Sequence, residues 1–135
     1  MINKLAIIGS TGSIGKNLLS IIGKDKKKFK IILLSANKNY TTLYKQAIKF
    51  NVKNLIITDK KSFKILQNKT KKTNIKVFNS FDKLNTIFKK KIDYVMNSIT
   101  GIDGLYPSIK IIKYTKKIAI ANKESIVTGW NLILK

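Results

Sequence analysis

The sequence lacks cysteine, histidine and arginine altogether, and has a single proline among its 135 residues. Without cysteine, a disulfide framework and a thiolate metal site are excluded. Without histidine, the commonest general base and the commonest metal ligand are missing. The few acidic residues are scattered and form no pair or cluster: Asp25, Asp59, Asp82, Asp93, Asp103 and Glu124. We therefore expect neither catalytic residues nor a metal site within this chain.

Long hydrophobic runs are absent as well. The apolar run at residues 5–8 is far too short for the core of a signal peptide, and no run approaches the length of a membrane span. The length suits one domain with its own core. The sequence therefore predicts a single cytoplasmic, soluble domain without a membrane partner.

Negative charge is scarce, and the formal net charge is +22. Such a charge alone suggests a nucleic-acid partner. All 28 basic residues, however, are lysines spread along the whole chain, and isoleucine and asparagine are abundant too. These three amino acids share A- and T-rich codons, whereas a surface selected for nucleic acid is expected to keep arginine. We interpret the charge as compositional drift and keep a basic nucleic-acid-binding domain as an alternative hypothesis.

Short apolar runs alternate with stretches of helical periodicity along the chain. The runs predict strands at residues 5–8, 31–34, 54–58, 75–78, 93–96 and 118–121, with the fourth partly exposed. The periodic stretches predict helices at 13–22, 41–50 (capped by Thr41 or Thr42), 60–67, 81–88, 105–114 and 124–134. Strands buried on both sides and alternating with helices predict an α/β, doubly wound, mostly parallel sheet of the Rossmann-like kind, with helices on both faces.

The first strand runs directly into a glycine-rich turn, Gly-Ser-Thr-Gly-Ser-Ile-Gly at residues 9–15, which opens the first helix. Gly9 permits a tight turn, Gly12 allows backbone to approach a pyrophosphate, and Gly15 lets the helix pack closely on the sheet. The helix N-terminus offers free N–H groups to phosphate. Further hydrogen bonds are expected from Thr11, Ser13 and the Ile14 backbone. This context favours nucleotide binding over a plain linking turn.

The end of the second strand bears on the choice of cofactor. NAD-binding domains usually carry an acid there, which binds the ribose 2′-hydroxyl. This sequence has Ser-Ala-Asn-Lys-Asn at residues 35–39 and no acid. Lys38 can instead pair with a 2′-phosphate, aided by Asn39 and Ser35. We therefore expect NADPH rather than NADH.

Two further patterns need interpretation. Residues 121–125, Ala-Asn-Lys-Glu-Ser, follow the last strand and suit either the rim of a nicotinamide and substrate site or the start of a helix capped by Asn122. Local physics leaves both open. Tyr106 and Lys110 fit the Tyr-x-x-x-Lys pattern of short-chain dehydrogenases, but a proline follows the tyrosine at once and the pair comes too soon after Gly15. We do not assign that chemistry.

The motifs at 9–15 and 121–125, taken together, resemble the 1-deoxy-D-xylulose 5-phosphate reductoisomerase family. Residues 37–39 resemble the family's Gly-Lys-Asn motif, with Asn37 in place of glycine, and residues 101–107 resemble its Gly-x-x-Gly-Leu-x-Pro segment. The resemblance implies NADPH pyrophosphate binding by Thr11, Gly12, Ser13 and Ile14. It implies a 2′-phosphate site at Asn37, Lys38 and Asn39, a nicotinamide border at Asn122 and Glu124, and substrate contact by Lys123.

The resemblance also implies parts that this chain does not contain. The family's Asp-Ser-Glu motif, which holds Mg²⁺ or Mn²⁺, its mobile loop and its C-terminal helical domain are expected downstream of residue 135. Residues 1–135 would then be an N-terminal NADPH-binding fragment, inactive alone, of an enzyme that is a homodimer. Such an enzyme rearranges and reduces 1-deoxy-D-xylulose 5-phosphate to 2-C-methyl-D-erythritol 4-phosphate in isoprenoid synthesis. The alternative within enzymes is another NADPH-dependent oxidoreductase, such as homoserine dehydrogenase.

Overall fold

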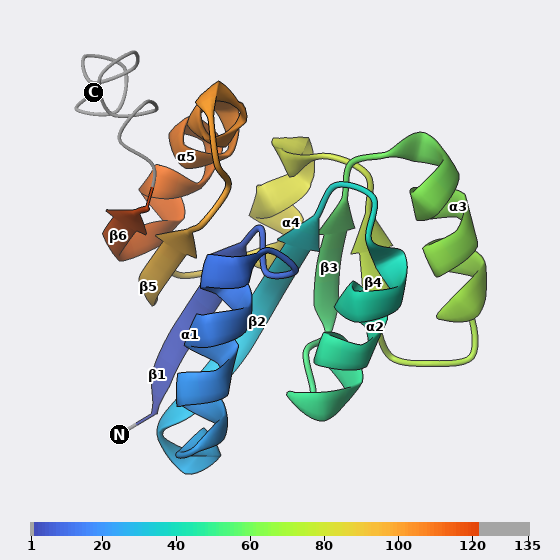
Figure 1. Ribbon diagram of the computed structural model, residues 1–135. Coiled ribbons are helices and arrows are strands. Elements are labelled where there is room, and N and C mark those ends of the chain that lie inside the picture. Colours follow the sequence, from blue (N-terminus) through green and yellow to red (C-terminus); the bar gives the residue numbers. More distant parts are fainter. Residues whose placement is uncertain (1, 122–135) are drawn as a thin grey trace.

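A computed structural model describes residues 2–121 and shows six strands in one sheet (Figure 1). Every strand pair in it is parallel, and the strand order is β4-β3-β2-β1-β5-β6. The strands are β1 (Asn3–Ile8), β2 (Phe29–Ala36), β3 (Asn54–Ile57), β4 (Lys76–Phe78), β5 (Ile92–Asn97) and β6 (Thr115–Ile120). The expected doubly wound parallel sheet is confirmed.

Helices connect the strands in sequence. The α-helices are α1 (Ser13–Gly23), α2 (Tyr40–Lys49), α3 (Lys60–Lys69), α4 (Leu84–Ile87) and α5 (Leu105–Ile111). Short 3₁₀ turns precede or follow them: η1 (Lys26–Lys28), η2 (Phe81–Lys83), η3 (Ile102–Gly104) and η4 (Ile112–Tyr114). No helix within residues 2–121 has the length and apolar content needed to cross a bilayer.

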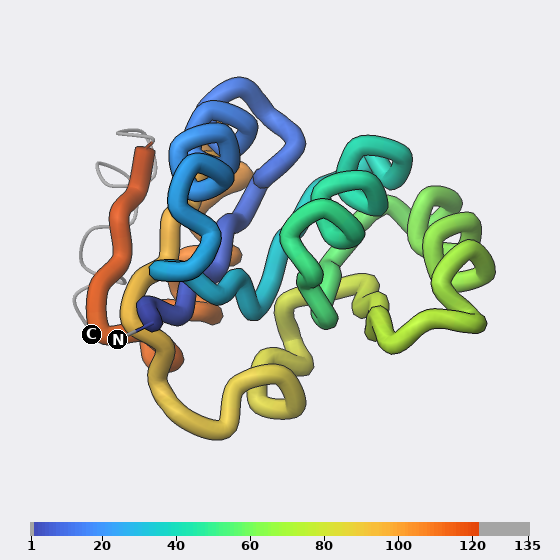
Figure 2. The backbone as a smooth tube through the Cα atoms, turned by 90° about the horizontal axis from the view of Figure 1, so that it is seen from below, coloured from blue at the N-terminus to red at the C-terminus, as the bar shows by residue number. Residues whose placement is uncertain are grey.

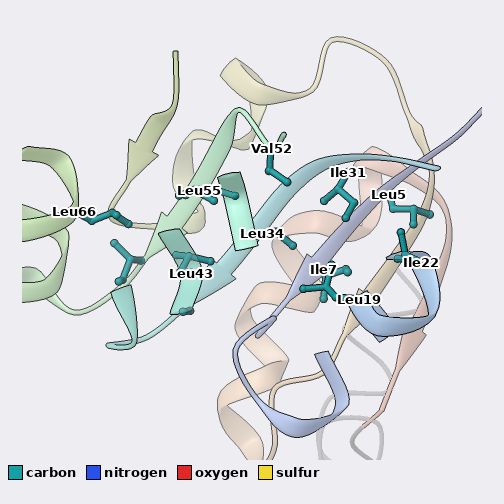
Figure 3. Packing of buried hydrophobic residues seen from close by; sticks show 13 residues of the cluster. Leu5, Ile7, Leu19, Ile22, Ile31, Leu34, Leu43, Val52, Leu55 and Leu66 are labelled. Atoms are coloured by element: carbon teal, nitrogen blue, oxygen red, sulfur yellow. The ribbon is translucent and has the colours of Figure 1, made fainter. Parts of the chain in front are cut away.

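Alternate residues of each strand serve two separate cores, because side chains of a strand point to opposite faces. Leu5 and Ile7 of β1 pack with α1, α2 and α3, and this cluster is drawn in Figure 3. Ala6 and Ile8 lie in the other core, against residues of η2, α4 and α5. Seen along the sheet, α1 and α2 lie on the side opposite α4 (Figure 2). The helices thus cover both faces, as expected.

The strand order reverses direction at β1. The chain proceeds from β1 to β2, β3 and β4 on one side, then crosses back and continues with β5 and β6 on the other. In open parallel sheets, ligands bind beyond the carboxyl ends of the strands at such a switch point. We therefore expect a ligand site at the turns that follow β1 and β5.

Several sequence predictions differ in detail from the structure. The second helix begins at Tyr40 and is capped by Asn39, whose side chain accepts the Thr42 N–H, so the expected threonine cap is wrong. The sixth strand starts three residues before the predicted position, at Thr115. Its residues 118–120 are only half-buried, because β6 is the outermost strand on its side within residues 2–121. The helix predicted at 124–134 lies outside the described residues.

Candidate functional site

The turn after β1 is shaped by two glycines that the fold itself requires. Gly9 has φ +78°, and a Cβ built there would lie 2.9 Å from Ile99 Cγ1. Gly15 is buried, and a Cβ there would lie 2.6 Å from Ser10 Cα and 2.7 Å from the Gly9 carbonyl oxygen. The atoms that a Cβ at Gly15 would meet belong to the backbone, which cannot move aside as a flexible side chain can. The turn and the start of α1 can therefore pack this closely only with glycine at both positions.

The third glycine of the motif is different. Gly12 is exposed, has φ −79° and ψ 175°, and a Cβ there would meet only the Gly9 carbonyl oxygen, at 3.7 Å. Any residue adopts such backbone angles, and that contact is an ordinary one. The fold therefore does not require glycine at residue 12, and the space beside it is available to a ligand.

Buried polar side chains hold the turn after β1 in place by hydrogen bonds to its backbone and to one another. Ser10 is fully buried; its hydroxyl donates to Gln46 Oε1 at 2.7 Å, and Gln46 Nε2 donates to the Ser10 carbonyl at 3.0 Å. Gly9 N–H donates to Ser35 Oγ at 3.0 Å. Ser35, expected to aid a 2′-phosphate, is buried, and its Oγ supports the turn. Gln46 ties the turn to α2, a role that no local sequence pattern indicated.

The strand on the other side of the switch point supports the same turn. Ser98, which follows β5, donates its hydroxyl to the carbonyls of Ile8 and Gly9, at 2.8 and 2.9 Å. Asn97 is buried and donates to the Gly104 carbonyl at 2.7 Å and to Ser108 Oγ at 2.6 Å, which fixes the start of α5. These residues were not among the predicted site residues. Together with the Ser10–Gln46 pair, they make the turn a rigid platform.

The N-terminus of α1 lies on this platform without a side-chain cap. The first bond of the helix ladder runs from Lys16 N–H to the Gly12 carbonyl at 2.9 Å, so the N–H groups of Ser13 and Ile14 precede the ladder. Both residues are exposed, and Thr11 is half-buried. The four residues 11–14 expected to bind a pyrophosphate therefore surround an open helix N-terminus, where backbone donors and the helix dipole favour an anion.

The turn after β2 carries the other predicted residues. Asn37, Lys38 and Asn39 are all exposed. Asn39 Oδ1 is engaged in capping α2, which leaves its amide donors for a ligand. Asp59, from the turn after β3, lies close enough for its charge to interact with Lys38, and its N–H donates to the Asn37 carbonyl at 3.0 Å. This carboxylate, which follows the third strand, was not among the residues predicted for the site.

Hydrogen bonding keeps Asp59 ionised. Its Oδ2 accepts from Ser62 N–H at 3.0 Å and from the Ser62 hydroxyl at 2.8 Å, which caps α3. These two bonds lower the pKa of Asp59, and the nearby charge of Lys38 lowers it further. The turn after β2 therefore holds a cation with a fixed anion beside it.

A cleft of about 380 Å³ opens along the carboxyl ends of the strands. It is lined by residues from the turns after five strands, and by α5: Gly9, Ser35, Ala36, Asn37, Thr58, Asn79, Ser80, Phe81, Ile99, Asp103, Tyr106 and Pro107. The cleft thus joins the glycine turn to the turn at residues 37–39. Asn122, Lys123 and Glu124, predicted at the nicotinamide and substrate side, lie outside the described residues.

The Tyr-x-x-x-Lys pair does not have the geometry of a proton donor. The Tyr106 hydroxyl donates to Asp82, and this bond raises the pKa of Tyr106. In the dehydrogenases with this pattern, the lysine lowers the pKa of the tyrosine; the charge of Lys110 acts in that direction here too, but the bond to Asp82 outweighs it. The two residues of α5 form a cluster with Asp82 of η2, and we assign them no proton transfer.

Within residues 2–121, no group of three acidic, histidine or cysteine side chains is placed to hold a metal ion. The features that remain are a glycine turn, an uncapped helix N-terminus and a cationic turn, gathered at the switch point of a parallel sheet. They define the class of the protein: a Rossmann-like dinucleotide-binding domain.

Comparison with known proteins gives the family. The chain matches the family described as 1-deoxy-D-xylulose 5-phosphate reductoisomerase over residues 5–129, and it belongs to that family. The reductoisomerase of Pelagibacter ubique strain HTCC1062 is 60% identical over 134 residues, and that of Wolbachia pipientis from Culex pipiens is 41% identical over 133 residues. Each alignment covers 98% of this chain and 34% of the relative. The chain therefore spans about a third of the length of these relatives.

Solved structures agree with this assignment. The reductoisomerase of Zymomonas mobilis in complex with NADPH superposes with a TM-score of 0.87 at 28% identity, over 99% of this chain and 35% of that one. A reductoisomerase in complex with NADPH, fosmidomycin and magnesium gives a TM-score of 0.88 at 26% identity, over 98% of this chain and 33% of that one. The matched family and the relatives and structures named above are all reductoisomerases, which favours this assignment over the dehydrogenase and nucleic-acid hypotheses.

Proposed function

We propose that this chain binds NADPH as the dinucleotide-binding part of a 1-deoxy-D-xylulose 5-phosphate reductoisomerase. The parent reaction rearranges the carbon skeleton of 1-deoxy-D-xylulose 5-phosphate and reduces the resulting aldehyde with NADPH to 2-C-methyl-D-erythritol 4-phosphate. The chain's own share is to hold and orient the cofactor. NADPH, when bound, supplies the hydride.

One observation carries the proposal: the N-terminus of α1 is uncapped, and Gly12 beside it is a glycine that the fold does not require. A pyrophosphate placed there would accept hydrogen bonds from the N–H groups of Ser13 and Ile14. Lys38, on the neighbouring turn, would pair with the 2′-phosphate that distinguishes NADPH from NADH. The solved Zymomonas mobilis relative is described in complex with NADPH, which supports the same cofactor here.

The remaining parts of the proposal concern the parent enzyme. We propose that Mg²⁺ or Mn²⁺ polarises the substrate's oxygens there, held by residues in the part of the relatives that this chain does not span. A relative is described with magnesium and fosmidomycin bound. We further propose that Lys123 contacts the sugar phosphate, that Asn122 and Glu124 border the nicotinamide, and that the parent is a homodimer of the cytoplasm without a nucleic-acid partner.

The cofactor assignment is tested by charge reversal at residue 38. We expect the 135-residue chain to bind NADPH more tightly than NADH, and Lys38→Glu to weaken NADPH by about 1.5–3 kcal/mol while changing NADH little, because one charge-assisted phosphate contact is lost. Isothermal titration calorimetry measures both affinities. Lys30→Glu is the matched control, since Lys30 is an exposed lysine at the amino end of β2, opposite the site. Equal affinity of the unmodified chain for the two cofactors would contradict the assignment.

An activity assay tests whether this chain only binds the cofactor while the rest of the parent enzyme supplies the catalytic residues. We expect the 135-residue chain to bind NADPH and yet not oxidise it in the presence of 1-deoxy-D-xylulose 5-phosphate and Mg²⁺ or Mn²⁺. Proton and hydride transfer on this substrate needs a metal or a positioned acid and a pocket that excludes water. Absorbance at the NADPH band measures turnover, with contaminating host enzyme excluded. Substrate-dependent turnover by this chain alone would show that the catalytic residues lie within it.

A further inference from the structure

A cluster of three side chains on α5 and η2 reaches the cleft through Tyr106, and none of its members is among the residues named above for NADPH binding. The Tyr106 hydroxyl donates to Asp82 Oδ1. Lys110 Nζ lies 3.4 Å from the same oxygen and 5.4 Å from the centroid of the Tyr106 ring. The carboxylate therefore bonds two residues that lie one helical turn apart on α5. The Tyr106 ring is therefore held at its hydroxyl by Asp82 and contacted on its face by Lys110.

The Tyr106 ring lies at the cleft, where it can contact a ligand. Tyr106 lines the cleft together with Phe81 and Pro107, and it is 49% exposed. A half-exposed tyrosine on a surface helix normally has rotational freedom, which this one loses through its bond to Asp82. The mutual hydrogen bond raises the pKa of Tyr106 and lowers that of Asp82, so both groups keep the protonation states that the bond requires at neutral pH.

The chemistry of the cleft around the ring suits a purine base. Phe81, Tyr106 and Pro107 supply apolar and aromatic surface, and Asn79 and Ser80 also line the cleft. Asn79 Nδ2 donates to the carbonyls of Ile57 and Thr58, which leaves its Oδ1 to accept from a base, and the Ser80 hydroxyl can donate while its oxygen accepts the Asp82 N–H. Planar bases stack on aromatic side chains whatever their sequence context. Asn37, which also lines the cleft, directly precedes Lys38. The adenine and the 2′-phosphate of NADPH are carried by one ribose, so a phosphate at Lys38 places the base within reach of this part of the cleft.

We propose that Tyr106 contacts the adenine base of the cofactor and that Asp82 and Lys110 are positioning residues that hold its ring at the cleft. The proposal rests on the NADPH binding proposed above. It assigns to residues 82, 106 and 110 a role in affinity for the adenosine half of the cofactor. It assigns them none in binding the nicotinamide half.

The experiment compares two halves of the cofactor. Adenosine 2′,5′-bisphosphate carries the base and the 2′-phosphate, and reduced nicotinamide mononucleotide carries neither. We expect Tyr106→Ala to weaken binding of NADPH and of adenosine 2′,5′-bisphosphate by the same factor, about tenfold, which is the order expected for the loss of one stacking ring. Binding of reduced nicotinamide mononucleotide should not change. Tyr106→Leu, which keeps an apolar side chain, serves if the alanine variant does not fold.

The positioning role needs a separate measurement. Asp82→Asn should weaken adenosine 2′,5′-bisphosphate by about threefold in the unmodified chain, and it should have no effect in a Tyr106→Phe background, where the hydroxyl that it holds is absent. This non-additivity is the signature of a residue that acts through another. Lys110→Gln should behave like Asp82→Asn, only more weakly. Thermal unfolding of each variant, followed by circular dichroism, controls for loss of fold.

The outcomes separate this inference from the proposed function. If the unmodified chain binds neither NADPH nor adenosine 2′,5′-bisphosphate, the proposed function fails. If it binds both and a folded Tyr106→Ala or Tyr106→Leu variant binds them equally well, the proposed function stands and the adenine contact is overturned. Additive effects of Asp82→Asn and Tyr106→Phe would overturn the positioning role alone.

Discussion

The first three strands each lead into a helix through a turn at the same edge of the sheet, and the three helices begin in two different ways. The N-terminus of α2 is capped by Asn39, which accepts the Thr42 N–H at 3.1 Å. That of α3 is capped by Asp59, which accepts the Ser62 N–H at 3.0 Å. That of α1 follows Gly12 and has no side-chain cap. Within one fold, a side-chain cap satisfies one first-turn N–H in each of two helices, and the third helix has no such cap.

The difference supports the proposed phosphate site more specifically than the glycine pattern does. A side-chain cap stabilises a helix by about 1 kcal/mol, so its omission at α1 costs stability unless another acceptor replaces it. The turn beneath α1 is nevertheless tied to neighbouring elements by the buried side-chain bonds of Ser10, Gln46 and Ser98. A rigid turn with an open helix end is what binding a phosphate requires. A substitution that caps α1 should therefore change mainly the affinity for NADPH, and one that disturbs the close packing of α1 on the turn should change mainly the stability of the fold.

The largest expected effect comes from giving α1 the cap that its neighbours have. Gly12→Asp places a carboxylate where the pyrophosphate is proposed to bind, and like charges in contact cost several kcal/mol. We expect NADPH affinity to fall more than about 100-fold, while the free energy of unfolding stays equal or rises by about 0.5–1 kcal/mol through capping. Calorimetry and urea unfolding measure the two quantities.

Gly12→Ala is the matched control for this change. Alanine adopts the backbone angles of residue 12 and meets only an ordinary contact, so stability should stay within about 0.5 kcal/mol. Its Cβ should weaken NADPH less than the aspartate does. A Gly12→Asp variant that binds NADPH as tightly as the unmodified chain would refute the role assigned to the open helix end.

The second effect is on stability rather than binding. Gly15→Ala forces a Cβ to within 2.6–2.7 Å of the backbone at Ser10 and Gly9, and we expect a loss of about 1–3 kcal/mol from overpacking. Gly23→Ala is the control in the same helix, because its Cβ would lie 3.7 Å from the Phe50 ring. That variant should be as stable as the parent or slightly more stable. Urea unfolding compares them, and equal stabilities of the two variants would contradict the packing argument.

The sequence indicated the sheet well because its strands are apolar runs separated by helical periodicity, and this pattern does not depend on distant partners. The sequence did not predict features that depend on a partner far away in the chain, or on which of several neighbouring residues caps a helix. Ser10 and Gln46 are 36 residues apart, so no local pattern joins them. Asn39 and the two threonines after it are all competent caps, and only the observed start of α2 selects the asparagine.

The carboxylate beside Lys38 could have been foreseen. The carboxyl ends of neighbouring parallel strands meet at one edge, and Asp59 follows β3 as Lys38 follows β2. The sequence prediction considered only the acid position after the second strand, where NAD-binding domains usually have one. The comparison of helix starts also shows that this acid has a structural task of its own, the cap of α3, so its presence does not by itself indicate a ribose hydroxyl as partner.

The smallest expected effect separates these two tasks of Asp59. Asparagine caps helices as well as aspartate does, so Asp59→Asn should keep the start of α3 and remove only the charge near Lys38. We expect affinity for NADPH to rise about twofold at low salt, as for other exposed charge interactions, and affinity for NADH to stay the same. Asp25→Asn is the control, since Asp25 follows the far end of α1 and pairs with Lys28.

The pH dependence of stability sharpens the same prediction. The Ser62 bonds lower the pKa of Asp59 in the folded state, so the ionised cap stabilises the fold at pH values above the ordinary aspartate pKa of about 3.9. This contribution is lost as the pH falls through the lower, folded-state value. The asparagine cap does not titrate, so the stability of Asp59→Asn relative to the unmodified chain should rise in acid and stay constant between pH 5 and pH 8. Urea unfolding at each pH measures it, and a relative stability that changes near neutral pH instead would mean that Asp59 is not held ionised by its cap.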